Sequence, residues 1–143
     1  MKYFLFPLII VSTCTFAAQV LDNNCKSPIS STGMVLMDKM REDMHVDTKS
    51  IPPENITTQL LFNEPVTDIL SDYYARESYN TEGIITQEKY KKIYSQFNPR
   101  NLIIKFTVKN KQGKEDVFLV STIANDYECN IEFNGYIIVK REF

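Results

Sequence analysis

The sequence predicts an α+β fold of two layers, in which N-terminal helices pack on one face of a C-terminal four-stranded antiparallel meander sheet. Two observations favour this class. Between residues 31 and 97, three segments carry apolar residues at every third or fourth position, which is the spacing of an amphipathic helix. From Leu102 onward the period changes to two, and β-branched and aromatic residues dominate, as is typical of half-buried strands. Helices followed by strands indicate an α+β architecture.

The first predicted helix covers residues 31–47, and its methionines and Leu36 fall close to one face. A second helix is expected to begin near Pro65 and to bury an apolar stripe at helical spacing. Its members are Val66, Ile69, Leu70 and Tyr73. The third covers residues 86–97, with Thr86 as its N-cap. Residues 50–65 contain paired prolines and are interpreted as a connector, with a short strand or hydrophobic plug at 60–62.

The predicted meander comprises residues 102–109, 116–123, 127–133 and 136–142. Asn134-Gly135 between the last two segments predicts a type I′ hairpin turn. The register of that turn places Cys129 on the face toward the helices. The last strand would lie at an edge of the sheet, where a partner strand can pair with it. The charges that would blunt that edge are Lys140, Arg141 and Glu142, and the edge at Leu102 stays open.

Residues 1–17 have the features of a secretory signal peptide: a charged Lys2, an apolar run and small residues up to Ala17. Residues 18–143 would then form a single exported domain in the periplasm or outside the cell. The apolar run is far shorter than the roughly 20 residues of a spanning helix, so stable membrane insertion after cleavage is not expected. Lipid attachment at Cys14 is the alternative, although the preceding Thr13 fits that signal poorly.

Export would leave the mature chain with two cysteines, Cys25 and Cys129, in an oxidising compartment. Disulfides form and persist there. We therefore expect one bridge between Cys25 and Cys129, and a pair of unpaired thiols or a reactive thiol is the alternative.

The composition argues against several classes of function. The formal net charge is −2 with both signs interspersed, so the electrostatic footprint of a nucleic-acid-binding protein is missing. The chain has a single histidine, His45, and we identify no catalytic residue, metal site or cofactor site. The paired carboxylates Asp68 and Asp72 could serve a hydrolase, which is an alternative to a non-enzymatic role.

A tyrosine-rich segment on the second predicted helix is the candidate partner-binding surface. Tyrosine and arginine are enriched at protein interfaces. The residues expected to contact a partner are Asp72, Tyr73, Tyr74, Arg76 and Tyr79. A partly buried helix end followed by a polar loop is the competing interpretation of the same segment.

The order of elements resembles that of small periplasmic domains of several families, among them immunity proteins, cystatin-like domains and accessory factors of pilus or secretion machines. This resemblance concerns architecture alone and carries over no residue role. We expect a non-enzymatic exported bacterial protein, monomeric or homodimeric, that binds another protein. An immunity protein that blocks a toxin is the first expectation. The alternatives are an accessory or chaperone factor for a surface structure and a small cystatin-like pocket domain with ligand-binding or hydrolase activity.

Overall fold

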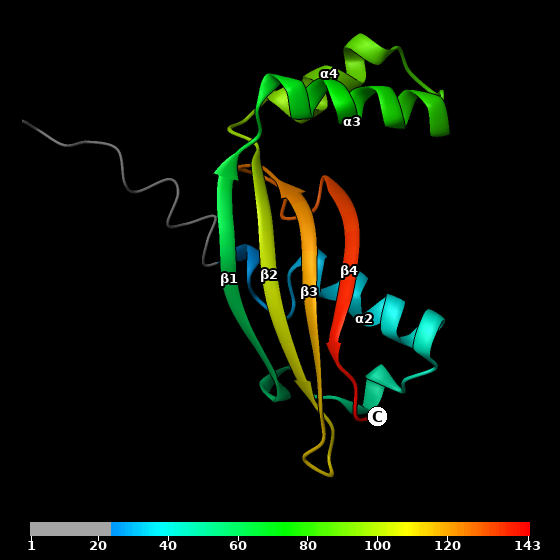
Figure 1. The fold of residues 1–143 in the computed structure, drawn as a ribbon, viewed down its shortest axis with the longest axis vertical. Helices are drawn as coiled ribbons and strands as arrows, with labels where there is room; N and C mark the ends of the chain where they lie inside the picture. The colour runs from blue at the N-terminus through cyan, green and yellow to red at the C-terminus, as the bar shows by residue number, and fades with distance from the viewer. Residues whose placement is uncertain (1–23) are drawn as a thin grey trace, which may run out of the picture.

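The computed structural model describes residues 24–143 and shows a four-stranded antiparallel sheet with the strand order β1-β2-β3-β4 (Figure 1). The predicted α+β class and a four-stranded antiparallel sheet are confirmed, but the sheet includes residues 56–65 and has one strand where two were predicted after residue 126. The predicted signal peptide and Cys14 lie outside the described residues. The elements are α2 (Ser31–Met44), β1 (Ile56–Pro65), α3 (Asp68–Thr81), α4 (Gln87–Ser95), β2 (Arg100–Lys109), β3 (Glu115–Ala124) and β4 (Glu132–Lys140), with short 3-10 helices at Thr48–Ser50 and Pro53–Asn55. Within the described residues, no helix is long and apolar enough to span a bilayer.

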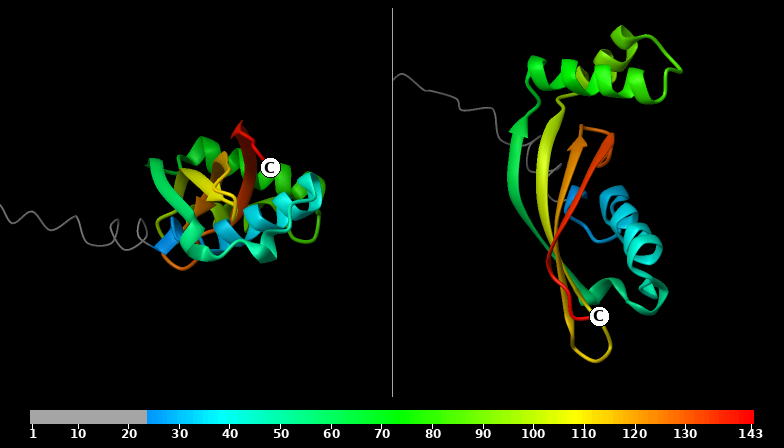
Figure 2. Two further views of the ribbon diagram at one scale, coloured as in Figure 1. Left: turned by 90° about the horizontal axis from the view of Figure 1, so that it is seen from below. Right: turned by 45° about the vertical axis from the view of Figure 1, so that its right-hand side comes forward.

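Helix α2 lies across one face of the sheet (Figure 2). It begins at the N-cap Ser30, whose hydroxyl accepts a hydrogen bond from the Gly33 amide, as a helix start requires. Its buried face includes Leu36, Met40 and Met44, so the methionine stripe belongs largely to the core, in agreement with its helical spacing. The helix ends at His45, which adopts a left-handed conformation with φ 59°.

The main core lies between α2 and the sheet face beneath it. Strand β2 turns every second side chain toward α2, and β3 adds its own alternate residues. The fully buried members on these strands include Leu102, Ile104, Phe106, Val108, Phe118 and Val120. Burial of one such side chain contributes about 1.5 to 3 kcal/mol to stability, so this layer is the main source of folding free energy.

Cys25 and Cys129 form the expected disulfide bond. Cys25 is buried in the main core, and Cys129 packs against that core from the loop before β4. The carbonyl of Cys129 also accepts a hydrogen bond of 2.6 Å from the hydroxyl of Thr32 in α2. The bridge therefore fastens the start of the described chain to the β3–β4 loop beside α2.

The predicted Asn134-Gly135 hairpin turn is wrong. Both residues lie inside β4, where Ser121 pairs with Gly135 and Thr122 pairs with Phe133, so that Asn134 is the extra residue of a β-bulge. Gly135 has φ 121°, and a glycine with positive φ is as suitable for a bulge as for a turn. Cys129 consequently lies in a loop and not in a strand.

The first strand of the sheet, β1, corresponds to the segment that the sequence presented as a connector. It pairs along its length with β2, so β2 is an interior strand and the open edge expected at Leu102 does not exist. A bulge at Leu61 interrupts the alternation, and paired prolines precede the strand. Because of these two features, residues 56–65 do not show the regular alternation of apolar and polar residues by which a strand is recognised in a sequence.

Helices α3 and α4 form a hairpin at one end of the sheet, between β1 and β2 in the chain (Figure 1). The predicted helix start near Pro65 is wrong, because Pro65 ends β1 and the N-cap is Thr67. The predicted buried stripe of this helix is also wrong. Ser71 and Ala75 are buried, whereas Ile69 is 84% exposed. Small residues at the contact allow α3 to lie close against α4.

Candidate protein-binding surface

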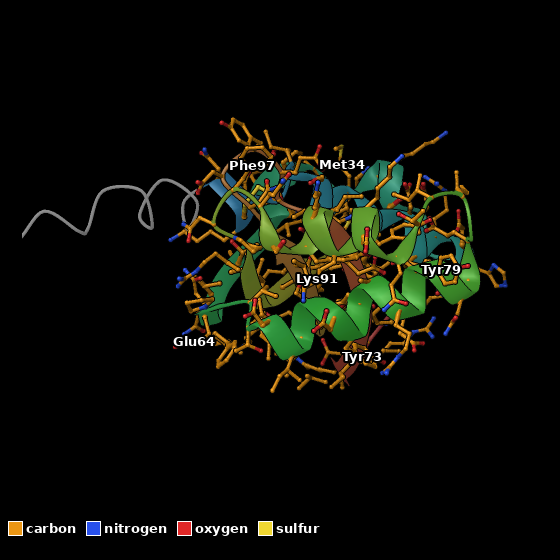
Figure 3. All side chains as sticks on the ribbon, turned by 90° about the horizontal axis from the view of Figure 1, so that it is seen from above. Met34, Glu64, Tyr73, Tyr79, Lys91 and Phe97 are labelled. Atoms are coloured by element: carbon orange, nitrogen blue, oxygen red, sulfur yellow. A yellow bond between two sulfur atoms is a disulfide. The ribbon has the colours of Figure 1, made fainter. Side chains whose placement is uncertain are left out.

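The outer side of α3 exposes most of the residues proposed as a partner-binding patch. Asp72, Tyr73, Arg76 and Tyr79 are all exposed, and their spacing of three or four positions brings them to one side of the helix. Tyr73 and Tyr79 each have 47% of their surface exposed. Figure 3, which looks onto the hairpin from the end of the sheet, shows both along α3. Ile69, one turn before Tyr73, extends this exposed side. We call these five residues the α3 face.

Tyr74 does not belong to the α3 face. It is half-buried, and its ring lies 5.4 Å from the ring of Tyr94, between α3 and the sheet. Burial raises the pKa of its phenol, and the nearby carboxylate of Glu132 raises it further. The ring of Tyr73 meets that of Tyr74 edge-on, with centroids 5.4 Å apart. Tyr74 therefore supports Tyr73 from beneath and does not contact solvent on the same side.

Tyr94 of α4 fixes the hairpin to β4. Its hydroxyl lies 2.7 Å from Oε2 of Glu132 and 2.8 Å from Oγ of Ser78, so one phenol joins α3, α4 and the sheet. Burial raises the pKa of Tyr94 above its usual value, and the bond to Glu132 acts in the same direction. A second apolar cluster surrounds this contact and includes Ala75, Tyr90 and Ile123. The α3 face is thus presented on a well-anchored support.

The carboxylates considered for a hydrolase lie on the solvent side of the hairpin. Asp72 forms an ion pair of 2.7 Å with Lys91 of α4, and the hydrogen bond between them raises the pKa of Lys91. Asp68 is exposed. An open hollow of about 220 Å³ next to this pair is lined by Asp72, Gln87, Glu88 and Lys91. Both aspartates are exposed to solvent. A carboxyl group that acts as a general acid is typically buried, because burial keeps it protonated.

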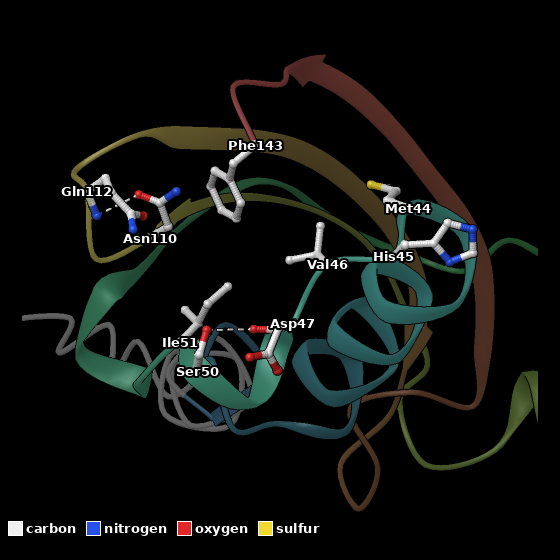
Figure 4. A pocket seen from close by; sticks show the side chains of 9 residues that line it. All are labelled: Met44, His45, Val46, Asp47, Ser50, Ile51, Asn110, Gln112 and Phe143. Atoms are coloured by element: carbon white, nitrogen blue, oxygen red, sulfur yellow. Dashed lines mark hydrogen bonds between the residues drawn. The ribbon is translucent and has the colours of Figure 1, made fainter.

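Another hollow lies at the opposite end of the molecule, beside the C-terminal end of α2 (Figure 4). It has a volume of about 230 Å³, and its lining includes His45, Asp47 and Phe143. The His45 ring points away from the other lining side chains in Figure 4. Nowhere in residues 24–143 do three or more His, Cys, Asp or Glu side chains group so that they could hold a metal ion.

Comparison with known proteins finds no match to a family model, to a curated protein or to a solved structure. The function of this chain is therefore inferred from its own residues and their geometry.

Sequence inspection brought four of the five proposed contact residues to one exposed face and misplaced Tyr74. It missed the exposure of Ile69, because the helical spacing of Ile69 from Tyr73 predicted burial. It also missed Glu132, whose place beside Tyr94 depends on the path of the loop before β4.

Proposed function

We propose that this protein is an exported, non-enzymatic protein that acts by binding another protein through the α3 face. The observation that carries the proposal is a row of exposed apolar, aromatic and arginine side chains on an anchored helix. Ile69 is 84% exposed and Tyr73 is 47% exposed, and Arg76 follows one turn later. Tyrosine and arginine at the centre of an interface carry a large share of binding energy.

The anchoring of the hairpin favours binding at low entropic cost. Tyr94 holds α3 and α4 to the sheet through Ser78 and Glu132, and Tyr74 fixes one side of the Tyr73 ring. A surface that is ordered before binding loses less conformational entropy when a partner docks. The mixed charges of Asp72 and Arg76 would provide a polar rim around the apolar residues.

The disulfide and the amino-terminal signal support an exported location, which we propose to be the periplasm or the extracellular space. Within this class, an immunity protein that blocks a toxin is the form we favour, and an accessory factor of a pilus or secretion machine is the alternative. Both forms require a protein partner and no catalytic centre, so the α3 face serves either. The chemical nature of the captured partner distinguishes them.

The experiment uses the mature chain with a photoreactive amino acid in place of Tyr73, irradiated in an extract of the exported proteins of the source cells. We expect a cross-link to one partner that mass spectrometry identifies. The matched control carries the same group at Gln59, an exposed position on β1. With the partner purified, the double substitution Tyr73→Ala/Arg76→Ala should weaken binding at least about 100-fold, since two interface hot spots cost about 2 kcal/mol or more each. Unchanged affinity in the double variant, or equal capture from Gln59, contradicts the proposal.

A further inference from the structure

Strand β4 forms one edge of the sheet and has an open side along its backbone (Figure 1). Its middle consists of three consecutive β-branched residues, Ile137, Ile138 and Val139, and Ile137 has 65% of its surface exposed. Exposed β-branched residues on an open edge favour pairing with a further strand. The other edge strand, β1, also exposes Leu61 and Phe62, but it is less suited to pairing because a bulge at Leu61 interrupts it and it ends at Pro65.

The charges expected to protect the β4 edge are engaged elsewhere. Nζ of Lys140 lies 3.5 Å from Oε2 of Glu115 in β3 and 3.0 Å from Oε1 of Glu142. Arg141 donates to the backbone carbonyls of Met44 and Phe143. Both basic side chains therefore have partners in their own chain, although the Lys140 side chain is still 43% exposed and their charges remain at this end of β4. The segment from Gly135 to Val139 contains no charged residue.

A hollow of about 420 Å³ lies beside this edge, on the sheet face opposite α2. Its lining includes Ile103, Leu119 and Ile137, and Gly135 forms part of its floor. A Cβ atom added to Gly135 would meet nothing within 4 Å. Ile137 lies on the same face, because it pairs with Leu119 as Gly135 pairs with Ser121. The edge thus presents an isoleucine and, two residues away, a space that an apolar side chain can fill.

The two ends of β4 differ in charge. The loop before it and its first residue carry three acidic side chains and no lysine or arginine: Asp126, Glu128 and Glu132. At the far end, the β2–β3 hairpin, the last residue of β4 and the two residues after it carry five basic side chains against three acidic ones. The basic residues are Lys109, Lys111, Lys114, Lys140 and Arg141, and the acidic ones are Glu115, Asp116 and Glu142.

We propose that the β4 edge pairs antiparallel with the β4 edge of a second copy of this chain, about a two-fold axis at Tyr136, to form a continuous eight-stranded sheet. In this register Ile137 of each copy lies opposite Gly135 of the other and fills its hollow. Antiparallel pairing also sets the acidic end of each β4 against the basic end of its partner. The contact is self-complementary, as a two-fold homodimer requires. The α3 face, at the end of the sheet (Figure 1), stays free on both copies.

The first experiment is sedimentation velocity of the mature, disulfide-bonded chain from about 5 µM to about 500 µM, the range in which small interfaces dissociate. We expect a concentration-dependent dimer. Ile137→Lys, at an exposed position, should lower the association constant at least tenfold with an unchanged circular dichroism spectrum. Gln59→Lys on the β1 edge is the matched control and should leave association unchanged. Raising the salt concentration should weaken the dimer, since the charges of opposite ends attract.

A second experiment measures the register without relying on loss of association. A photoreactive amino acid replaces Ile137 in an isotopically labelled copy, which is mixed with unlabelled chain and irradiated. The expected product is a cross-link between copies at the peptide that contains Gly135. Three results would overturn the proposal: a monomer at every concentration, a dimer that Ile137→Lys leaves intact, or a cross-link that maps to β1. The first of these leaves the β4 edge open to a strand from a different protein.

Discussion

Removal of the disulfide should lower the free energy of unfolding by about 4.7 kcal/mol. The bond joins residues 104 positions apart, and the chain-entropy model gives about 4.7 kcal/mol for a closed loop of about 100 residues. The perturbation is the double substitution Cys25→Ala/Cys129→Ala. A domain of this size has a total stability of about 5 to 15 kcal/mol, so the loss is between about a third and nearly all of the free energy of unfolding.

Urea denaturation measures this loss. With a slope of about 2 kcal/mol per molar urea, the midpoint should fall by about 2 M. The slope itself should rise, because the unbridged denatured chain is less compact and exposes more surface. Thr32→Val serves as the control, since it removes the hydrogen bond from Thr32 to the Cys129 carbonyl and keeps the bridge. This variant should lose only about 1 kcal/mol. A loss below about 1.5 kcal/mol in the double variant, with an unchanged slope, would refute the entropic argument.

Two further predictions concern α2 and the helical hairpin. Gly33→Ala should lower stability by about 2 to 3 kcal/mol in thermal denaturation, because the new Cβ would lie 2.2 Å from the backbone oxygen of Pro28. Gly113→Ala is the control, because a Cβ there would meet no atom within 4 Å and only the positive φ of 79° opposes it, at a cost of about 1 to 2 kcal/mol. Equal losses of stability in the two variants would contradict a steric clash at Gly33. Tyr94→Phe should lose about 1 kcal/mol at pH 7 through its bonds to Ser78 and Glu132. Folding raises the pKa of Tyr94. The contribution of Tyr94 to the free energy of unfolding is therefore fully present below about pH 10, the pKa of tyrosine in the unfolded chain, and declines as the pH rises above that value. Urea titrations should then show a less steep loss of stability between about pH 10 and 11 in the Phe variant than in the wild type, and parallel curves contradict this assignment.

The elements that are determined by residues close together in the chain could be predicted from the sequence. Thr86, the predicted N-cap, accepts a hydrogen bond from the Lys89 amide and marks the start of α4. The alternation in β2 and β3 follows the burial of every second residue. The disulfide pairing was predictable because the expected cleavage after Ala17 would leave two cysteines and therefore one bridge.

Other features depend on tertiary partners. Ile69 and Tyr73 have the spacing of a buried stripe, but α3 packs through Ser71 and Ala75 because its neighbour is another helix at close range. Asn134-Gly135 supplies the positive φ that a turn or a bulge needs, and only the pairing of β3 with β4 decides between them. The position of Tyr74 behind the α3 face follows from that same packing.

The α3–α4 hairpin leaves and re-enters the sheet at a single place. Its two ends meet at neighbouring strands that already pair, with Pro65 opposite Arg100, and the Val66 amide bonds the Pro99 carbonyl across the base. The sheet registers are therefore set without the insertion. Substitutions on the solvent side of the segment between these two prolines should therefore leave the pairing of the strands unchanged. The outer surface at this end of the sheet can thus be altered while the bridged core stays the same.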